Sequence, residues 1–184
     1  MGDWFQNLVD VGARGVDAES TASRVLTWLI DNGYVQAVKT DCVLGAEGGY
    51  APGPRSEEAV IGGPALPLSV NGVIICTGRA VYHTWGDGME LRCPRCGGSV
   101  GDEPARWDAV GDVIGSWVAG GDSVACCVFC GGHFELNEWD WGANPWAFGE
   151  LGLTFCNWPP LAPEFVDAVS RVMNHRVVYN HGKF

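Results

Sequence analysis

The spacing of apolar residues predicts two amphipathic helices. In ESTASRVLTWLIDNGY, residues 19–34, apolar side chains recur at the three- and four-residue intervals that share one helical face: Val25, Leu26, Leu29 and Ile30. Ser20 is suited to cap the start of this helix, and Asn32-Gly33 supplies a stop signal. The segment PEFVDAVSRVM, residues 163–173, has the same periodicity near the end of the chain.

A third helix is predicted in the middle of the chain, within GDEPARWDAVGDVIGSWVAGGD, residues 101–122. Its apolar residues form one helical stripe: Trp107, Val110, Val113, Ile114, Trp117 and Val118. Gly120-Gly121 is suited to end it, whereas Gly111 and Gly115 in its interior lower its helix propensity.

Short apolar runs between these helices predict strands. Strand-like patterns cover residues 34–44, 152–158 and 175–181, and a short strand is expected within residues 133–141. The runs NGVIICTG and RAVYHTW, residues 71–85, predict two strands joined by a tight turn at Thr77-Gly78-Arg79. Residues 45–69 are rich in Gly and Pro and predict a long loop, interrupted by a short helical turn around residues 56–58.

The order of these elements predicts an α+β fold. The last third of the chain has the order β-α-β, and together with the earlier helix and strands it indicates a mixed sheet with helices packed on one face. At 184 residues the chain is long enough to bury the core of one such domain that carries a small insertion.

Two segments share one cysteine spacing. CPRCGG at residues 93–98 is followed by CVFCGG at residues 127–132. Two tight turns of this kind supply four thiolates at a small cost in chain entropy, and tetrahedral Zn²⁺ requires four donors. A glycine after the second cysteine adopts the positive φ that such a turn needs, and backbone N–H groups then point at the sulfurs.

These segments resemble the two knuckles of zinc-ribbon and rubredoxin-knuckle proteins, over about residues 91–135. The resemblance implies that a zinc ion is bound by Cys93, Cys96, Cys127 and Cys130. Because four sulfurs leave no position for water, the implied zinc is structural rather than catalytic. We therefore divide the chain into residues 1–90, the N-terminal part of the α+β domain, residues 91–135, a zinc-ribbon insertion with its own helix, and residues 136–184, the C-terminal β-α-β part.

Two further residues compete for the metal. Cys126 offers a Cys-x-x-x-Cys spacing with Cys130, and His133 follows Cys130 closely enough to replace one ligand. We favour Cys127 over Cys126 because it restores the two-residue spacing and its glycine partner. A thioredoxin-like redox pair would need one Cys-x-x-Cys at a helix start, whereas this chain has two, each followed by Gly-Gly.

The charge balance restricts the expected partners. The chain has 22 acidic and 11 basic residues, a formal charge of −11. Such a surface repels nucleic-acid phosphates and membrane lipids and favours a basic protein partner. The N-terminus lacks the features of a signal peptide, and no segment is apolar enough to span a bilayer, so we expect a soluble, cytoplasmic protein. In that reducing compartment Cys-x-x-Cys favours metal over disulfides.

Tryptophan is unusually frequent, with nine residues. Three of them crowd into EWDWGANPWAF, residues 138–148. We interpret Trp139, Trp141 and Trp146, together with acidic Glu138 and Asp140, as a candidate partner-binding patch. The alternative is that the tryptophans cover the cysteine segment and pack it onto the sheet.

These features favour a non-enzymatic, acidic protein-binding module with a structural zinc site. A bacterial immunity protein that inhibits a basic toxin is one concrete form. One alternative is an enzyme that uses an open zinc site or a cysteine–histidine pair, such as Cys156 with His175 or His181. The other is a zinc-ribbon nucleic-acid-binding protein, which the charge disfavours. The chain contains no nucleophile elbow, P-loop, dinucleotide fingerprint or His-Glu-x-x-His motif, so we assign no catalytic residue.

Overall fold

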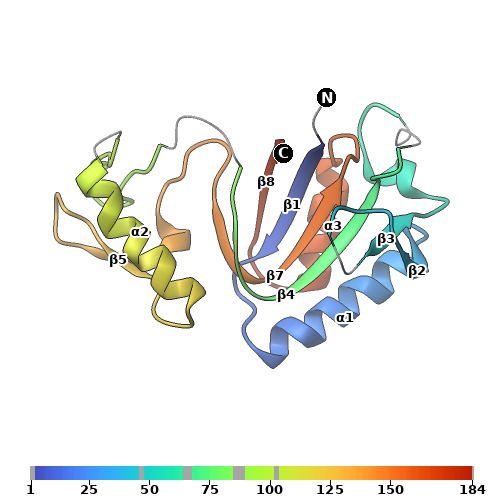
Figure 1. Cartoon of the computed structure of the whole chain (residues 1–184), viewed down its shortest axis with the longest axis horizontal. Helices are drawn as coiled ribbons and strands as arrows, with labels where there is room; N and C mark the ends of the chain where they lie inside the picture. Colours follow the sequence, from blue (N-terminus) through green and yellow to red (C-terminus); the bar gives the residue numbers. More distant parts are fainter. Residues whose placement is uncertain (1–2, 46–47, 64–67, 85–89, 102–103, 184) are drawn as a thin grey trace.

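A six-stranded sheet with the strand order β2-β3-β4-β7-β1-β8 forms the main body of the protein (Figure 1). The computed structural model describes residues 3–45, 48–63, 68–84, 90–101 and 104–183. The strands of this sheet are Trp4–Asp10 (β1), Val35–Thr40 (β2), Gly49–Pro52 (β3), Gly72–Tyr82 (β4), Ala147–Cys156 (β7) and Val177–Lys183 (β8). Two helices, Val16–Asp31 (α1) and Pro163–Met173 (α3), pack against one face of the sheet.

The predicted α+β class is confirmed, but the sheet is not mixed. Every pairing between the described strands of this sheet is antiparallel. β7 and β8 are joined by α3 and run parallel to each other, yet β1 lies between them and is antiparallel to both. The order of elements along the chain does not reveal that the first strand separates the last two.

Buried faces of α1 and α3 meet the sheet in one core. This core is formed by residues of both helices and of β1, β4 and β7, including Leu8, Val25, Leu29, Val73, Leu153, Phe155, Phe165 and Val169. The helix predicted at residues 163–173 is confirmed with those bounds as α3. Ser20 is not the cap of α1, because the helix begins at Val16 and the Ser20 hydroxyl donates to the carbonyl of Asp17, at 3.0 Å, inside it.

β1 was not predicted as a strand, although it lies inside the sheet, between β7 and β8. From Phe5 to Asp10 every residue is buried, so the alternation of polar and apolar residues that marks a half-exposed strand is missing. Its polar side chains are satisfied inside the protein: Gln6 Nε2 donates to the carbonyls of Trp158 and Pro159, and Asn7 Nδ2 donates to Asn180 Oδ1 at 2.8 Å.

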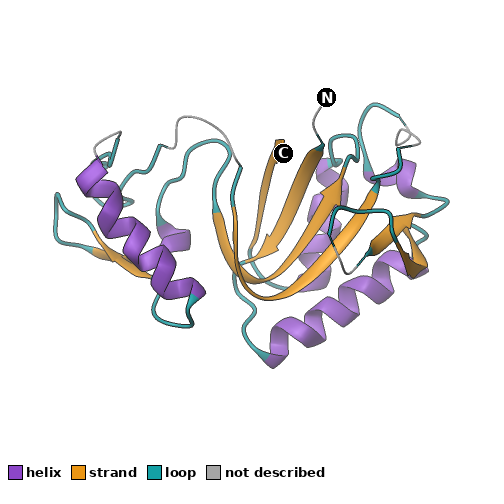
Figure 2. Ribbon diagram, viewed as in Figure 1, coloured by secondary structure: helices purple, strands orange, loops and turns teal. Residues whose placement is uncertain are grey.

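The predicted turn at Thr77-Gly78-Arg79 is wrong. Residues 72–82 form one continuous strand, β4, whose register against β7 shifts between Thr77 and Ala80. Gly78 has a φ of 99°, a conformation that glycine adopts easily in a tight turn or in a β-bulge. Here it makes a bulge, and β4 and β7 bend strongly together, as Figure 2 shows. Trp85, the last residue of the predicted pair, lies outside the described residues.

The bend brings the far ends of β4 and β7 against β8, which is the edge strand on the other side of the sheet. Asn180 Nδ2 donates to the carbonyls of Tyr82 at 2.9 Å and Pro145 at 2.8 Å. The side-chain amide of Asn144 pairs with both backbone groups of His181, at 2.7 and 3.0 Å. A side chain thus occupies an edge that would otherwise be open to another strand.

The segment between β4 and β7 folds into a separate lobe, at the opposite end of the molecule from β2 and β3 (Figure 1). It contains helix Pro104–Val118 (α2), the hairpin of Val124–Cys126 (β5) and His133–Glu135 (β6), and the 3₁₀ turn Leu136–Glu138 (η2). The predicted strand within residues 133–141 is therefore only three residues long. A core distinct from that of the sheet holds the lobe together: Leu91, Val100, Val110, Trp117, Leu136, Trp139, Trp141 and Phe148.

The Gly- and Pro-rich region 45–69 is more ordered than predicted in its described part. It contains β3, which was missed because its sequence GYAP carries little strand signal. The helical turn expected around residues 56–58 is confirmed as a 3₁₀ turn at Ser56–Ala59 (η1).

Candidate metal centre

Four cysteines from the two Cys-x-x-Cys-Gly-Gly segments meet in the lobe. The Sγ atoms of Cys93, Cys96, Cys127 and Cys130 all lie within 4.8 Å of one another. Cys93 and Cys130 are 3.8 Å apart at their sulfurs, and Cys96 and Cys127 are also 3.8 Å apart. A regular tetrahedron with Zn–S bonds of about 2.3 Å has sulfur–sulfur edges of about 3.8 Å, so this sulfur set fits a tetrahedral thiophilic ion.

The two cysteine turns have the same backbone geometry. In the first, Cys93 N–H donates to the carbonyl of Gly98, and Gly97 N–H donates to the carbonyl of Cys93, both at 2.9 Å. The second turn repeats these bonds: Cys127 N–H donates to the carbonyl of Gly132 at 2.7 Å, and Gly131 N–H donates to the carbonyl of Cys127 at 2.8 Å. Gly97 and Gly131 have φ values of 68° and 67°, in the left-handed region that a Cβ atom disfavours. The first glycine of each pair is therefore required by the turn.

The second glycine of each pair is explained by an aromatic ring. A Cβ atom on Gly98 would lie 2.5 Å from the ring of Phe129, and one on Gly132 would lie 2.7 Å from the ring of Phe134. Phe129 belongs to the second cysteine turn and covers the first, so this contact also ties the two turns together. These phenylalanines were not singled out from the sequence. The second glycine of each pair is the signal that could have found them, because glycine permits a close approach to the backbone.

The pKa values of Cys93 and Cys96 depend on the neighbouring thiols. Burial raises the pKa of Cys93, but hydrogen bonds from the backbone N–H groups of Cys96 and Arg95 and from the thiols of Cys127 and Cys96 together outweigh burial and lower that pKa to about 7. At Cys96 the N–H of Gly98 lowers the pKa, but burial and the neighbouring cysteine sulfurs have the larger effect, and the net result is a pKa raised from 9.0 to about 11. Ionisation of one cysteine thus disfavours ionisation of its neighbours. A divalent ion among the sulfurs would remove this repulsion between thiolates.

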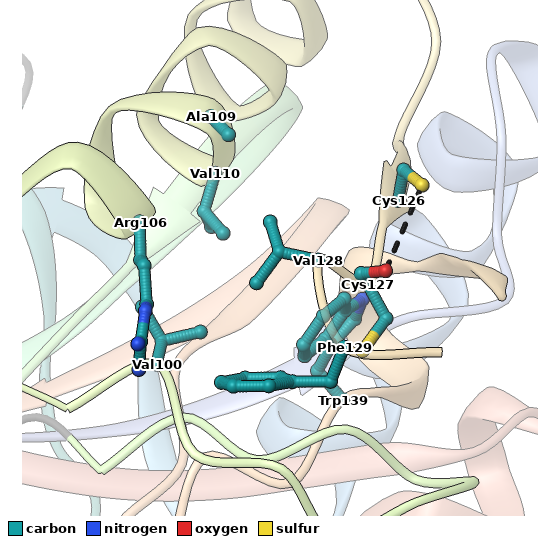
Figure 3. A pocket seen from close by; sticks show the side chains of 9 residues that line it. All are labelled: Val100, Arg106, Ala109, Val110, Cys126, Cys127, Val128, Phe129 and Trp139. Atoms are coloured by element: carbon teal, nitrogen blue, oxygen red, sulfur yellow. Dashed lines mark hydrogen bonds between the residues drawn. The ribbon is translucent and has the colours of Figure 1, made fainter. Parts of the chain in front are cut away.

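Neither competing ligand joins the cluster. Cys126 lies on β5 with an exposed side chain, and its Sγ contacts the carbonyl of Cys127 at 3.9 Å (Figure 3). His133 is exposed on β6, and the four-cysteine group does not include it. Beside Cys127 a crevice of about 10 Å³ separates α2 from the second cysteine turn, which is about the space of a single water molecule.

The tryptophans of the predicted partner-binding patch are placed unequally. Trp139 and Trp141 are 5% and 6% exposed, in the core of the lobe. Their indole N–H groups donate to the carbonyls of Phe134, at 3.4 Å, and Leu136, at 2.7 Å. This packing agrees with the alternative interpretation, in which they cover the cysteine segment. Trp146 is half-buried.

The acidic members of that patch lie at the surface. Glu138 accepts the backbone N–H of Glu135 at 2.7 Å, and Asp140 accepts that of Gly142 at 2.9 Å. Both carboxylates are exposed. Partner binding by this group of residues stays a prediction, and its accessible members are Glu138, Asp140 and Trp146.

The cysteine–histidine pairs considered for catalysis are not assembled. Cys156 is 2% exposed, and burial raises its pKa to about 11. In the sheet register Cys156 and Gly182 both pair with Phe5, whereas His181 pairs with Gln6, so His181 points to the opposite face. His175 lies before β8, where its Nδ1 is 2.9 Å from the buried carboxylate of Asp10. Cys156 therefore pairs with neither histidine: His181 lies on the opposite face of the sheet, and His175 contacts Asp10.

Comparison with known proteins adds no further relationship. No family model, no curated protein and no solved structure matches this chain. Within the described part of the chain, every helix is too short or too polar to cross a membrane.

Proposed function

We propose that Cys93, Cys96, Cys127 and Cys130 bind one Zn²⁺ and that this ion holds the lobe in its folded state. The observation that carries the proposal is the pair of 3.8 Å sulfur–sulfur edges, which match a tetrahedral Zn–S₄ centre. Zinc is the expected occupant because thiolates select soft ions and the four-sulfur tetrahedron suits zinc or iron.

The ion is structural in this proposal. Four sulfurs fill the coordination sphere, so no position is left for water or substrate. When bound, the ion cross-links a turn that enters the lobe at Cys93 to a turn that precedes β6. These turns are short and rich in glycine, and metal–sulfur bonds stabilise such segments in addition to the packing of Phe129 on Gly98.

The metal proposal is tested by elemental analysis of the purified protein. We expect one zinc per chain, and a Co²⁺-substituted sample should have the sulfur-to-cobalt charge-transfer absorption of a four-thiolate site. Cys96→Ser should lose most of the metal, whereas the matched variant Cys126→Ser should keep it. Protein that holds no metal, or Cys126→Ser protein that loses it, would contradict the assignment; iron in place of zinc would correct the ion only.

The molecule carrying this centre is then a non-enzymatic binding protein for a basic protein partner. Two observations support this function: the formal charge of −11, and the contacts that the basic residues near the cysteines make with other side chains of the same chain. Arg92 pairs with Glu90, while Arg95 and Arg106 lie over the rings of Phe134, at 5.3 Å, and Phe129, at 4.9 Å. An immunity-type inhibitor of a basic toxin is one form of this function, because such an inhibitor works by covering a basic surface with acidic groups.

Association with partners from the producing cell tests the binding proposal. We expect the zinc-loaded protein to retain basic proteins at low salt, with association rates that fall on the order of tenfold or more as salt is raised. Glu138→Gln/Asp140→Asn should slow association further, whereas the charge-matched control Glu57→Gln/Asp167→Asn, far from the lobe, should have a smaller effect. Association that is independent of salt would contradict an acidic recognition surface.

A further inference from the structure

A groove between α2 and Trp146 remains unexplained by the metal centre. It has a volume of about 540 Å³ and is lined by six residues: Trp107, Asp108, Gly111, Asp112, Ile114 and Trp146. Five of these come from α2, and Trp146 comes from the segment that leads into β7. The groove therefore combines aromatic walls with two carboxylates.

The aromatic walls of the groove pack against other rings of the lobe. Trp146 is stacked on the buried Trp141, with ring centroids 5.4 Å apart and an interplanar angle of 4°. The ring of His83 lies 5.2 Å from that of Trp146. Trp107 donates its indole N–H to the carbonyl of Gly101 at 2.5 Å, and its ring centroid is 6.5 Å from that of Trp141. The two tryptophans that line the groove thus share one buried support.

The charge of the groove is entirely negative. Asp108 and Asp112 are exposed and lie four residues apart, so they project from the same face of α2. Among the described residues neither carboxylate has an ion-pair partner, and no basic side chain lines the groove. Two like charges at this spacing disfavour an isolated helix, and a bound cation would remove that cost.

Gly111 is the smallest residue in the wall of the groove. It lies in the interior of α2, where glycine is a poor helix former, and its φ is not in the left-handed region. A Cβ atom built on Gly111 would meet no described atom within 4 Å, so internal packing does not require glycine here. The missing side chain instead leaves space in the wall of the groove.

We propose that this groove binds the cationic side chain of a lysine or arginine on the basic partner. The inference rests on the proposed binding function and names the recognition element. Carboxylates supply charge complementarity, and tryptophan faces attract a cation that sits over them within about 6 Å of the ring centre. Glycine at position 111 gives the aliphatic part of that side chain room to lie along the helix.

Short peptides test the groove directly. Zinc-loaded, ¹⁵N-labelled protein is titrated with acetyl-Gly-Lys-Gly-amide, with the arginine analogue, and with a norleucine analogue that has a similar aliphatic chain without charge. We expect the lysine and arginine peptides to shift the indole N–H signals of Trp107 and Trp146 and the amide signal of Gly111. Equal shifts with norleucine, or shifts only outside the groove, would overturn the proposal.

Matched variants separate recognition from folding. Asp108→Asn/Asp112→Asn should weaken lysine-peptide binding about tenfold, whereas the charge-matched control Glu57→Gln/Asp167→Asn should leave it within about twofold. Gly111→Ala and Gly115→Ala should both raise the melting temperature, since a Cβ atom at either position meets nothing. Only Gly111→Ala should weaken peptide binding; equal effects, or none, of both variants on binding would contradict a role for the groove wall.

The groove and the proposed function can fail separately. If a basic partner associates equally well with the Asp108→Asn/Asp112→Asn variant, the groove proposal fails while the binding function stands. If the peptides bind in the groove but only acidic or neutral partners are found, the partner proposal fails and the cation site stands.

Discussion

The guanidinium of Arg79 lies 4.3 Å from the ring centre of Trp117, and its Nη1 donates to the carbonyl of the same residue at 3.1 Å. Arg79 is on β4 beside the bulge, and Trp117 is in the last turn of α2. Nη1 also donates to the carbonyl of Gly121 at 2.6 Å. The Trp117 carbonyl also accepts the N–H of Gly120, at 3.0 Å. A cation at this position adds hydrogen bonds at the C-terminal end of the helix, where the helix dipole favours positive charge.

Two further residues complete this junction between the lobe and the sheet. Glu150 on β7 accepts Arg79 Nε at 3.3 Å and the N–H of Gly15 at 2.6 Å. The guanidinium of Arg14 lies 5.4 Å from the ring centre of Trp117. The junction therefore connects α2, β4, β7 and the start of α1.

Arg79→Ala should loosen the lobe without unfolding the sheet. Loss of the charged hydrogen bonds and of the ring contact should cost about 2–3 kcal/mol. Hydrogen exchange should accelerate in α2 more than in α1 and α3, which belong to the other core. Arg79→Lys should be intermediate, because lysine keeps the charge but not the planar fork. Equal acceleration in all three helices would contradict a junction role.

Substitutions at the first glycine pair should act by different mechanisms. Gly97→Ala should cost roughly 1–2 kcal/mol because its φ is in the left-handed region. Gly98→Ala should destabilise by a clash with Phe129, so Phe129→Ala should partly restore the Gly98→Ala protein but not the Gly97→Ala protein. Thermal unfolding of the zinc-loaded variants measures this double-mutant comparison. Rescue of both, or of neither, would contradict the ring contact.

Removal of the metal should unfold the lobe and leave the sheet. The two cores are separate clusters of buried residues, and the cysteines belong to that of the lobe. In a strong chelator we expect amide protection to be lost in α2, β5 and β6 and kept in β1, β7 and α3. Cys126→Ser protein should respond like the wild type, because Cys126 lies outside the cluster. Loss of protection across the whole sheet would indicate one cooperative unit.

The buried thiol of Cys156 should make the protein less stable in alkali. Burial raises its pKa from 9.0 to about 11, so the folded protein keeps this proton at pH values where the unfolded chain releases it. This thiol therefore does not lower the free energy of unfolding below about pH 9, and it lowers it increasingly as pH rises from 9 towards 11. Urea unfolding from pH 7.5 upwards should therefore show wild type losing stability relative to Cys156→Ala. A difference that is independent of pH would contradict this.

The two cysteine turns were predictable because the geometry of each is local. Two Cys-x-x-Cys-Gly-Gly segments each form a closed turn within six residues, and the sequence displays the whole turn. The choice of Cys127 over Cys126 followed from the same local spacing. The partners of the second glycines could not be predicted, because Phe129 reaches Gly98 from a segment some thirty residues away.

The tryptophan cluster shows where local reasoning ends. Exposed and buried tryptophans have the same sequence signal, so composition could not separate Trp146 from Trp139 and Trp141. Their burial depends on packing against Val110 and Trp117 of α2, which only the folded lobe brings to them.

By itself, the sequence determined the α+β class, the helix at 163–173 and the cysteine turns, because helical periodicity and turn chemistry act over a few neighbouring residues. Only the tertiary structure decided that β1 separates β7 from β8, that Gly78 makes a bulge rather than a turn, and that Arg79 holds α2. The physical reason is that these features depend on pairing and hydrogen bonds between residues far apart in the chain, whose free energies no local pattern records.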